Sequence, residues 1–234
     1  MEESNETPEE TPVTPPAPAP TDTEGVLRKP KRDLFPQDIL DFYTVYDYRH
    51  AAAILVTEFK SEFDEICHTL RAFRFTDEQV KASGGNESAI PKTFSSILEP
   101  VKWKERKLSA KLVVDDKTAN ESSHKIDYVK NRIALDIEWN SKDQTFDRDL
   151  TAFRAFFDYG QISVGILVTR DSSLVPYFRS LGMFTDKYGV VREVIDKYGA
   201  STTHMDKLLP KLTAGRSGGC PVLAFGITPA LRKR

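Results

Sequence analysis

Three carboxylates interrupt the apolar runs of the segment HKIDYVKNRIALDIEW, residues 124–139. They are Asp127, Asp136 and Glu138, and acids are poorly suited both to strands and to burial. Carboxylate oxygens suit Mg²⁺, which takes its remaining ligands from waters and phosphate oxygens. A hard cation polarises a phosphoryl oxygen, so the segment predicts phosphodiester hydrolysis with Asp127 and Asp136 as metal ligands. Glu138 would contact a second metal ion or orient and deprotonate the attacking water.

A tight turn is expected at residues 130–131, between the two apolar runs. This register would place Asp127 opposite Ala134 and diagonal to Asp136, and Glu138 would share the face of Asp136 because strand side chains alternate. Diagonal side chains lie roughly 7–8 Å apart, a gap that two carboxylates can close around a cation. The alternative, which the pattern alone favours, is that the acids only mark the solvent-facing side of an antiparallel sheet.

The residues around these acids resemble the active-site hairpin of the PD…(D/E)xK nucleases, specifically of type II restriction endonucleases of the BglII and BstYI kind. That family has an Ile-Asp dipeptide followed by an acid and then Gln or Glu at the end of an apolar strand, as in IDYV and ALDIEWNSK. The upstream segment VKWKERKL is similar to a family motif and nominates Glu105 as a fourth active-site residue. Scattered likeness covers residues 46–228. Glu138 stands where the superfamily usually has Lys, as it does in the related BamHI-like enzymes.

The resemblance implies a restriction-endonuclease-like core and a Mg²⁺-dependent enzyme that cuts double-stranded DNA. A homodimer is expected, because two-fold protein symmetry matches a palindromic site and supplies one active site for each strand. The same likeness suggests a short palindrome centred on GATC.

Three further segments are expected to contact DNA on the strength of this resemblance. NSK follows the catalytic strand, RDSS follows another apolar strand, and STTH offers hydroxyls and helix N-terminal amides to phosphates. Each segment also has the composition of a helix cap, and both interpretations stand. The residues expected to bind DNA are Asn140, Ser141, Lys142, Arg170, Asp171, Ser172, Ser173, Thr202, Thr203 and His204.

Two other functions stay open from the sequence. A PD…(D/E)xK nuclease of the repair or structure-specific type would use the same metal site with little sequence preference. A catalytically silent DNA-binding module would carry the acids only as surface groups. Discrete fragments from a digested phage genome would favour restriction over the first, and Mg²⁺-dependent cutting that disappears when Asp136 and Glu138 are changed to Ala would exclude the second.

The composition predicts one folded domain preceded by a tail. Residues 1–25 combine seven acids and six prolines with no Lys or Arg, which is typical of disorder. Residues 26–234 would form a single nuclease domain with a net charge of +5, compatible with a nucleic-acid partner. No apolar run approaches a bilayer span and no signal peptide is recognisable, so we expect a cytoplasmic protein. Cys67 and Cys220 lack metal-ligand spacing, which predicts reduced buried thiols.

Hydrophobic periodicity predicts a mixed α/β fold, with helices covering a central sheet. The segment 83–96 is expected to be a loop because it contains glycines and a proline. In helix 144–160, Phe146, Leu150, Phe153 and Phe157 would share a buried face. The predicted strands are 42–50, 109–116, the hairpin 124–139, 162–169 and 220–227, and the predicted helices are 51–73, 144–160, 172–182 and 202–215.

Overall fold

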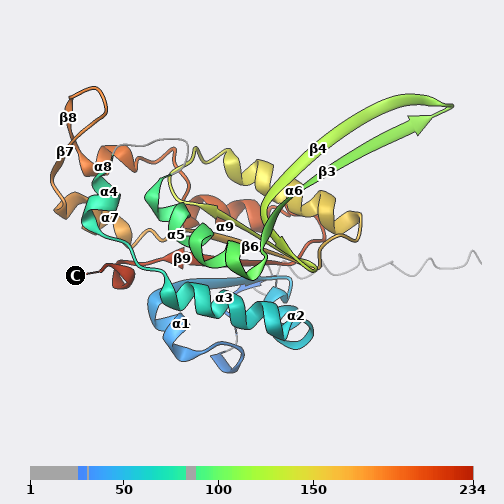
Figure 1. Cartoon of the computed structure of the whole chain (residues 1–234), viewed down its shortest axis with the longest axis horizontal. Helices are drawn as coiled ribbons and strands as arrows, with labels where there is room; N and C mark the ends of the chain where they lie inside the picture. Colours follow the sequence, from blue (N-terminus) through green and yellow to red (C-terminus); the bar gives the residue numbers. More distant parts are fainter. Residues whose placement is uncertain (1–25, 31, 83–87, 234) are drawn as a thin grey trace, which may run out of the picture.

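The computed structural model describes residues 26–30, 32–82 and 88–233, so the predicted tail, residues 1–25, lies outside the described residues. Seven strands of the described chain form one mixed sheet in the order β1-β2-β9-β6-β5-β4-β3 (Figure 1). The three central strands β5, β6 and β9 are parallel, and β1, β2, β3 and β4 pair antiparallel with their neighbours. The strands are β1 Leu27–Arg28, β2 Tyr43–Tyr48, β3 Lys104–Val114, β4 Lys117–Lys130, β5 Ile133–Glu138, β6 Val164–Arg170 and β9 Val222–Ile227, with a separate hairpin of β7 Met183–Thr185 and β8 Val191–Glu193.

Helices cover both faces of this sheet, which confirms the predicted α/β class. One face carries α2, α3, α5 and α7, and the other carries α6 and α9. In the described residues, no helix is long and apolar enough to cross a membrane. The helices are α1 Gln37–Phe42, α2 Ala51–Glu58, α3 Lys60–Ala72, α4 Asp77–Lys81, α5 Ala89–Leu98, α6 Thr145–Asp158, α7 Leu174–Ser180, α8 Val194–Lys197 and α9 Met205–Thr213, with 3₁₀ turns η2 Arg32–Leu34, η3 Glu99–Val101 and η4 Pro229–Leu231.

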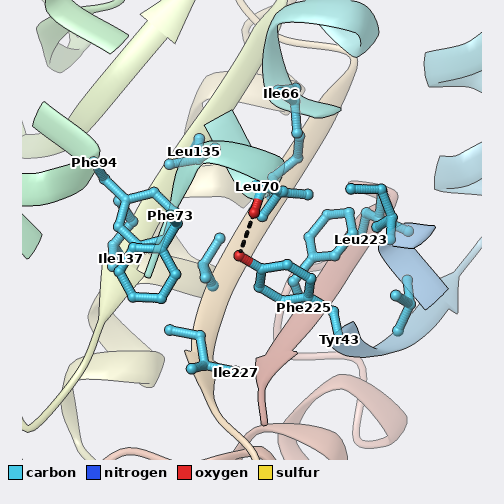
Figure 2. Close-up of a cluster of buried hydrophobic side chains, with 14 of the residues drawn as sticks. Tyr43, Ile66, Leu70, Phe73, Phe94, Leu135, Ile137, Leu223, Phe225 and Ile227 are labelled. Atoms are coloured by element: carbon cyan, nitrogen blue, oxygen red, sulfur yellow. Dashed lines mark hydrogen bonds between the residues drawn. The ribbon is translucent and has the colours of Figure 1, made fainter. Parts of the chain in front are cut away.

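The larger core lies between the sheet and α2, α3 and α5. Figure 2 shows the hydroxyl of Tyr43 donating to the carbonyl oxygen of Leu70 at 2.9 Å, which satisfies a polar group within this apolar layer. Phe73 stacks on Phe94 with ring centroids 4.4 Å apart. Cys67 lies in this core, and burial raises the pKa of its thiol to about 11. Cys67 and Cys220 are both free and buried, as the sequence predicts.

The second core lies under α6, the helix that connects β5 to its parallel neighbour β6. Phe146, Leu150 and Phe153 are fully buried against the sheet, as the periodicity predicts, whereas Phe157 is only partly buried. Gly165 of β6 lies against the ring of Phe153, where a Cβ atom would approach within 2.4 Å. This close approach holds α6 firmly over the carboxylate-bearing strand.

Two expectations about the elements are wrong. The predicted helix 51–73 is two helices that meet at Phe59, whose non-helical backbone (φ −130°, ψ 48°) ends α2. α2 lies directly on β2, β6 and β9, whereas α3 packs against α1 and α5 and reaches the sheet through Leu70. The predicted loop 83–96 contains α5: Pro91 lies in the first turn, where no amide hydrogen is needed. Residues 83–87 of that segment lie outside the described residues.

The predicted helix caps are also displaced. α9 begins after His204 rather than at Thr202 or Thr203, and α6 begins after Gln144 rather than at Ser141 or Asp143. In both places the hydroxyl residues make tertiary contacts instead, which are described below.

Candidate active site

The β4–β5 hairpin positions the predicted acids, but its turn differs from the expected one. Lys130 pairs with Ile133, so the turn consists of residues 131–132 rather than 130–131. Asn131 adopts a φ of +49°, a left-handed conformation that Asn tolerates better than most residues. The last pair of the ladder is Tyr128–Leu135, so Asp127 comes next to Asp136 and not opposite Ala134, and this register favours the predicted convergence of the two carboxylates.

Asp127 lies at a β-bulge. Between the pairs Lys104–Val129 and Arg106–Ile126, β4 has one residue more than β3, so Asp127 and Tyr128 both face Glu105. A bulge of this kind bends a strand and redirects its side chains. The backbone N–H of Asp127 donates to Oδ1 of Asp136 at 2.8 Å, which locks the two acidic positions together.

A cavity of about 330 Å³ lies between part of the hairpin and α6, and acids from both elements line it. Asp127, Asp136 and Asp149 share this cavity with Arg148. Asp136, Glu138 and Asp149 are only 3%, 5% and 1% exposed, whereas the side chain of Asp127 is 52% exposed. The structure therefore gathers the predicted acids, and it adds one from a helix that sequence reasoning had not connected with them.

Arg148 is the basic residue nearest to the buried acids. Its Nε and Nη2 donate to Oδ1 of Asp149 at 3.1 and 2.9 Å, and Nη2 also reaches Oε1 of Glu138 at 3.4 Å. The side chain is 69% exposed, so solvent screens its charge. Lys125 also lines the cavity, but its side chain is likewise exposed and pairs with Glu105 and Asp127, so basic groups compensate the three buried carboxyl groups only in part.

The electrostatics follow from this imbalance. Burial, and next the negative charge of Asp149, raise the pKa of Glu138 to about 8. The same two causes raise the pKa of Asp136 well above its usual range. Burial raises the pKa of Asp149 to about 6 although Arg148 opposes the shift. Burial is thus the largest cause of all three shifts, and the charge of Asp149 adds to the pKa shifts of Asp136 and Glu138.

The donor set fits a divalent cation. Oδ2 of Asp136 and Oδ2 of Asp149 are buried and receive no hydrogen bond from the described residues. In the same part of the chain, no group of three His, Cys, Asp or Glu side chains is arranged so that it could hold a metal ion, so cation binding requires these side chains to move together. A hard cation would supply the missing charge and partner the free carboxylate oxygens, the ligands that Mg²⁺ prefers.

Glu105, the predicted fourth residue, lies beside this cluster on β3. Lys125 bridges it to Asp127, with Nζ 2.6 Å from Oε2 of Glu105 and 3.6 Å from Oδ1 of Asp127. Glu105 and Asp127 also line a second cavity of about 650 Å³, toward Trp103 and α5. Asp127 therefore lies at the junction of two hollows.

The three segments expected to bind DNA meet at the carboxyl ends of β5 and β6. The amide of Thr203 donates to Ser141 at 2.9 Å, and that of Asp143 donates to Ser201 at 3.0 Å. Lys142 is paired with Thr202 by an isolated bridge. Ligands commonly bind at this edge of parallel strands.

Within these segments, exposure varies widely. Lys142 and Ser173 are exposed, and Asn140, Ser141, Asp171, Ser172, Thr202 and His204 are partly buried. The amide of Asn140 donates to the carbonyl oxygen of Lys197 at 3.2 Å, and its own Oδ1 is buried without a partner among the described residues.

Arg170 is buried and fastens these segments to one another. Its guanidinium donates to the carbonyl oxygens of Trp139 at 2.6 Å and Thr203 at 2.8 Å, and to the hydroxyl of Thr202 at 2.5 Å. It also lies over the ring of Tyr198. Arg170 is 3% exposed and Thr203 is fully buried, so in this structure both residues position the loops beside the acids.

Sequence reasoning missed Asp149 and Arg148. Asp149 follows Phe146 by three residues and precedes Phe153 by four, so it lies on the apolar face of α6. An acid on the apolar face of an amphipathic helix could have been noticed in the sequence as a candidate site residue. Only the fold shows that this face of α6 lies over the acids of the hairpin.

Comparison with known proteins agrees with this arrangement. Residues 43–227 match the profile of the family described as restriction endonuclease BglII/BglIII. No curated protein matches the chain. The matched range includes the central sheet from β2 to β9, the acidic hairpin and α6, and it covers well over half of the sequence. The chain therefore belongs to the BglII/BglIII restriction endonuclease family, whose members are DNA-cleaving hydrolases.

Proposed function

We propose that this protein is a Mg²⁺-dependent type II restriction endonuclease that cuts both strands of a short palindromic DNA site as a homodimer. The observation that carries the proposal is the group of buried carboxylates on β5 and α6, whose charge is not balanced by the basic residues around it. Buried carboxylates without counter-charges lower the free energy of unfolding. A cation that binds with the DNA phosphate would supply the counter-charge and restore that free energy.

In this proposal Asp127 and Asp136 hold the metal ion. When bound, the ion supplies positive charge to the phosphoryl oxygen and to the leaving oxygen. Glu138 accepts the proton of the attacking water through its carboxylate, which the positive charge of a bound cation would keep ionised at neutral pH. Glu105, paired with Lys125, keeps Asp127 in place at its bulge.

The DNA would lie across the carboxyl ends of β5 and β6. Asn140, Ser141 and Lys142 directly follow the catalytic strand, and amide, hydroxyl and ammonium groups are the types that read base edges. The accessible residues of the segments 170–173 and 201–204 form the adjoining surface, where their hydroxyls can hold phosphates, whereas the buried Arg170 and Thr203 position these segments. We propose a palindrome centred on GATC.

The test is digestion of a phage genome with Mg²⁺ present. The proposal expects discrete fragments, and run-off sequencing of the ends should give one palindrome; fragments that end at unrelated sequences would refute site specificity. The double variant Asp136→Ala/Glu138→Ala should lose cleavage and keep DNA binding in Ca²⁺. Light scattering of the purified protein should give twice the monomer mass, and a monomer that cuts both strands at once would contradict the dimer.

A further inference from the structure

Asp149 is an acid that the family resemblance does not assign to the site. It comes from α6, whereas Asp127, Asp136 and Glu138 come from the β4–β5 hairpin. Its carboxyl group is almost completely buried, and it lines the cavity that Asp127 and Asp136 also line. Isolated buried carboxylates are costly and normally have firm partners.

The partner that Asp149 has is weak. Arg148 donates to Oδ1, but that guanidinium is largely in solvent, and exposed ion pairs contribute little. Oδ2 is buried and receives no hydrogen bond from the described residues, and the nearby Asp136 has a free Oδ2 of its own. A single cation in the cavity could therefore bind both free oxygens, Oδ2 of Asp136 and Oδ2 of Asp149.

Asp147, two residues earlier on α6, shows how the same helix treats a structural acid. Its Oδ2 lies 2.6 Å from Nζ of Lys211. Its Oδ1 receives no hydrogen bond from the described residues either, but it lies 3.6 Å from Nη1 of Arg216, so α9 and the following turn supply the counter-charges of Asp147. Asp149 has no basic partner from another element of the described chain, and its neighbour on the hairpin is another acid, the carboxyl group of Glu138. Asp147 thus joins α6 to α9, whereas Asp149 faces the cavity.

We propose that Asp149 is a further carboxylate of the cation site, contributing Oδ2 to the divalent ion that Asp127 and Asp136 hold. α6 then closes the site from the side opposite the hairpin. Arg148 is the internal counter-charge of the metal-free protein, and it competes with the cation for Asp149 and Glu138. This inference rests on the proposed metal-dependent function and adds to it a ligand from a second element.

The experiment measures binding of Ca²⁺ alone, by isothermal titration calorimetry on the full chain without DNA. Asp149→Asn keeps the shape of the side chain and should weaken Ca²⁺ binding by about tenfold or more. Arg148→Ala removes the competing charge and should tighten binding by about two- to fivefold, the range of an exposed ion pair. Asp147→Asn is the matched control on the same helix and should bind as the unchanged protein does.

The opposite signs of the two variants distinguish a ligand from a structural pair. If Asp149 and Arg148 only brace α6, both variants weaken binding, and that result overturns the inference. Unchanged affinity in Asp149→Asn overturns it as well. Circular dichroism verifies the fold, and if Asp149→Asn does not fold, the sign of Arg148→Ala decides. A failure of the unchanged protein to bind Ca²⁺ and cut DNA refutes the proposed function itself, which is a separate outcome.

Discussion

Replacing Glu138 by Gln should stabilise the metal-free protein while destroying its proposed activity. The pKa of Glu138 is raised from 4.5 to about 8 by burial and by the charge of Asp149. Between these two values the folded protein retains a proton that the unfolded chain releases. Unfolding therefore becomes easier as the pH rises through this window, and the stability is fully present only below about pH 4.5. Gln cannot ionise, so it removes this loss.

The size of the effect follows from the shift. Each pKa unit corresponds to about 1.4 kcal/mol, so the expected gain in the free energy of unfolding is roughly 3 kcal/mol at pH 7 and roughly 1 kcal/mol at pH 5. The substitution also gives up the ion pair with Arg148. That loss is small because the guanidinium is mostly exposed and its contact with Glu138 is 3.4 Å long.

The assay is urea unfolding followed by circular dichroism at both pH values, with EDTA present. The midpoint should rise at pH 7 with an unchanged slope, because the surface exposed on unfolding stays the same. Asp127→Asn is the control, since that carboxylate is half exposed, and it should change stability little. No gain at pH 7, or an equal gain at both pH values, would show that buried charge is not what destabilises this site.

Three further outcomes test the supporting structure. Gly165→Ala should cost about 1–3 kcal/mol of unfolding free energy in urea titrations, because its methyl group would meet the ring of Phe153, and an unaltered midpoint would contradict that packing. Arg170→Met should cost about 1–3 kcal/mol by leaving buried carbonyl oxygens without donors, with faster amide exchange at Thr203; protection as in the unchanged protein would contradict the clamp. Ca²⁺ at 100 times its Kd should add about 2.7 kcal/mol to the unchanged protein and much less to Asp136→Asn, and equal gains would place the cation elsewhere.

The sequence was sufficient for the fold class, because its periodicities are local. The apolar run 162–169 predicts the buried strand β6, and the spacing of Phe146, Leu150 and Phe153 predicts the covered face of α6. Such patterns depend only on the spacing of apolar residues along one strand or helix, so they can be recognised without knowledge of the rest of the chain. The segment 83–96 shows the limit, since its glycines and proline obscured α5.

The acids of the hairpin could also be found from the sequence, since Asp127, Asp136 and Glu138 lie within twelve residues of one another. Their register could not, because the turn depends on the left-handed conformation of Asn131, and its amide is fixed by Glu62 of α3. Contacts between distant segments decide such choices, and no local pattern encodes them.

Only the tertiary structure brought Asp149 to the hairpin and buried Arg170 among the loops of the proposed DNA surface. Taken alone, Asp149 is a polar residue on an apolar helix face and Arg170 is a cation at a strand end. The sequence determined which side chains could do chemistry. The packing of α6 across β5 determined how many carboxylates share one cavity, and therefore how strongly they repel each other and require a cation.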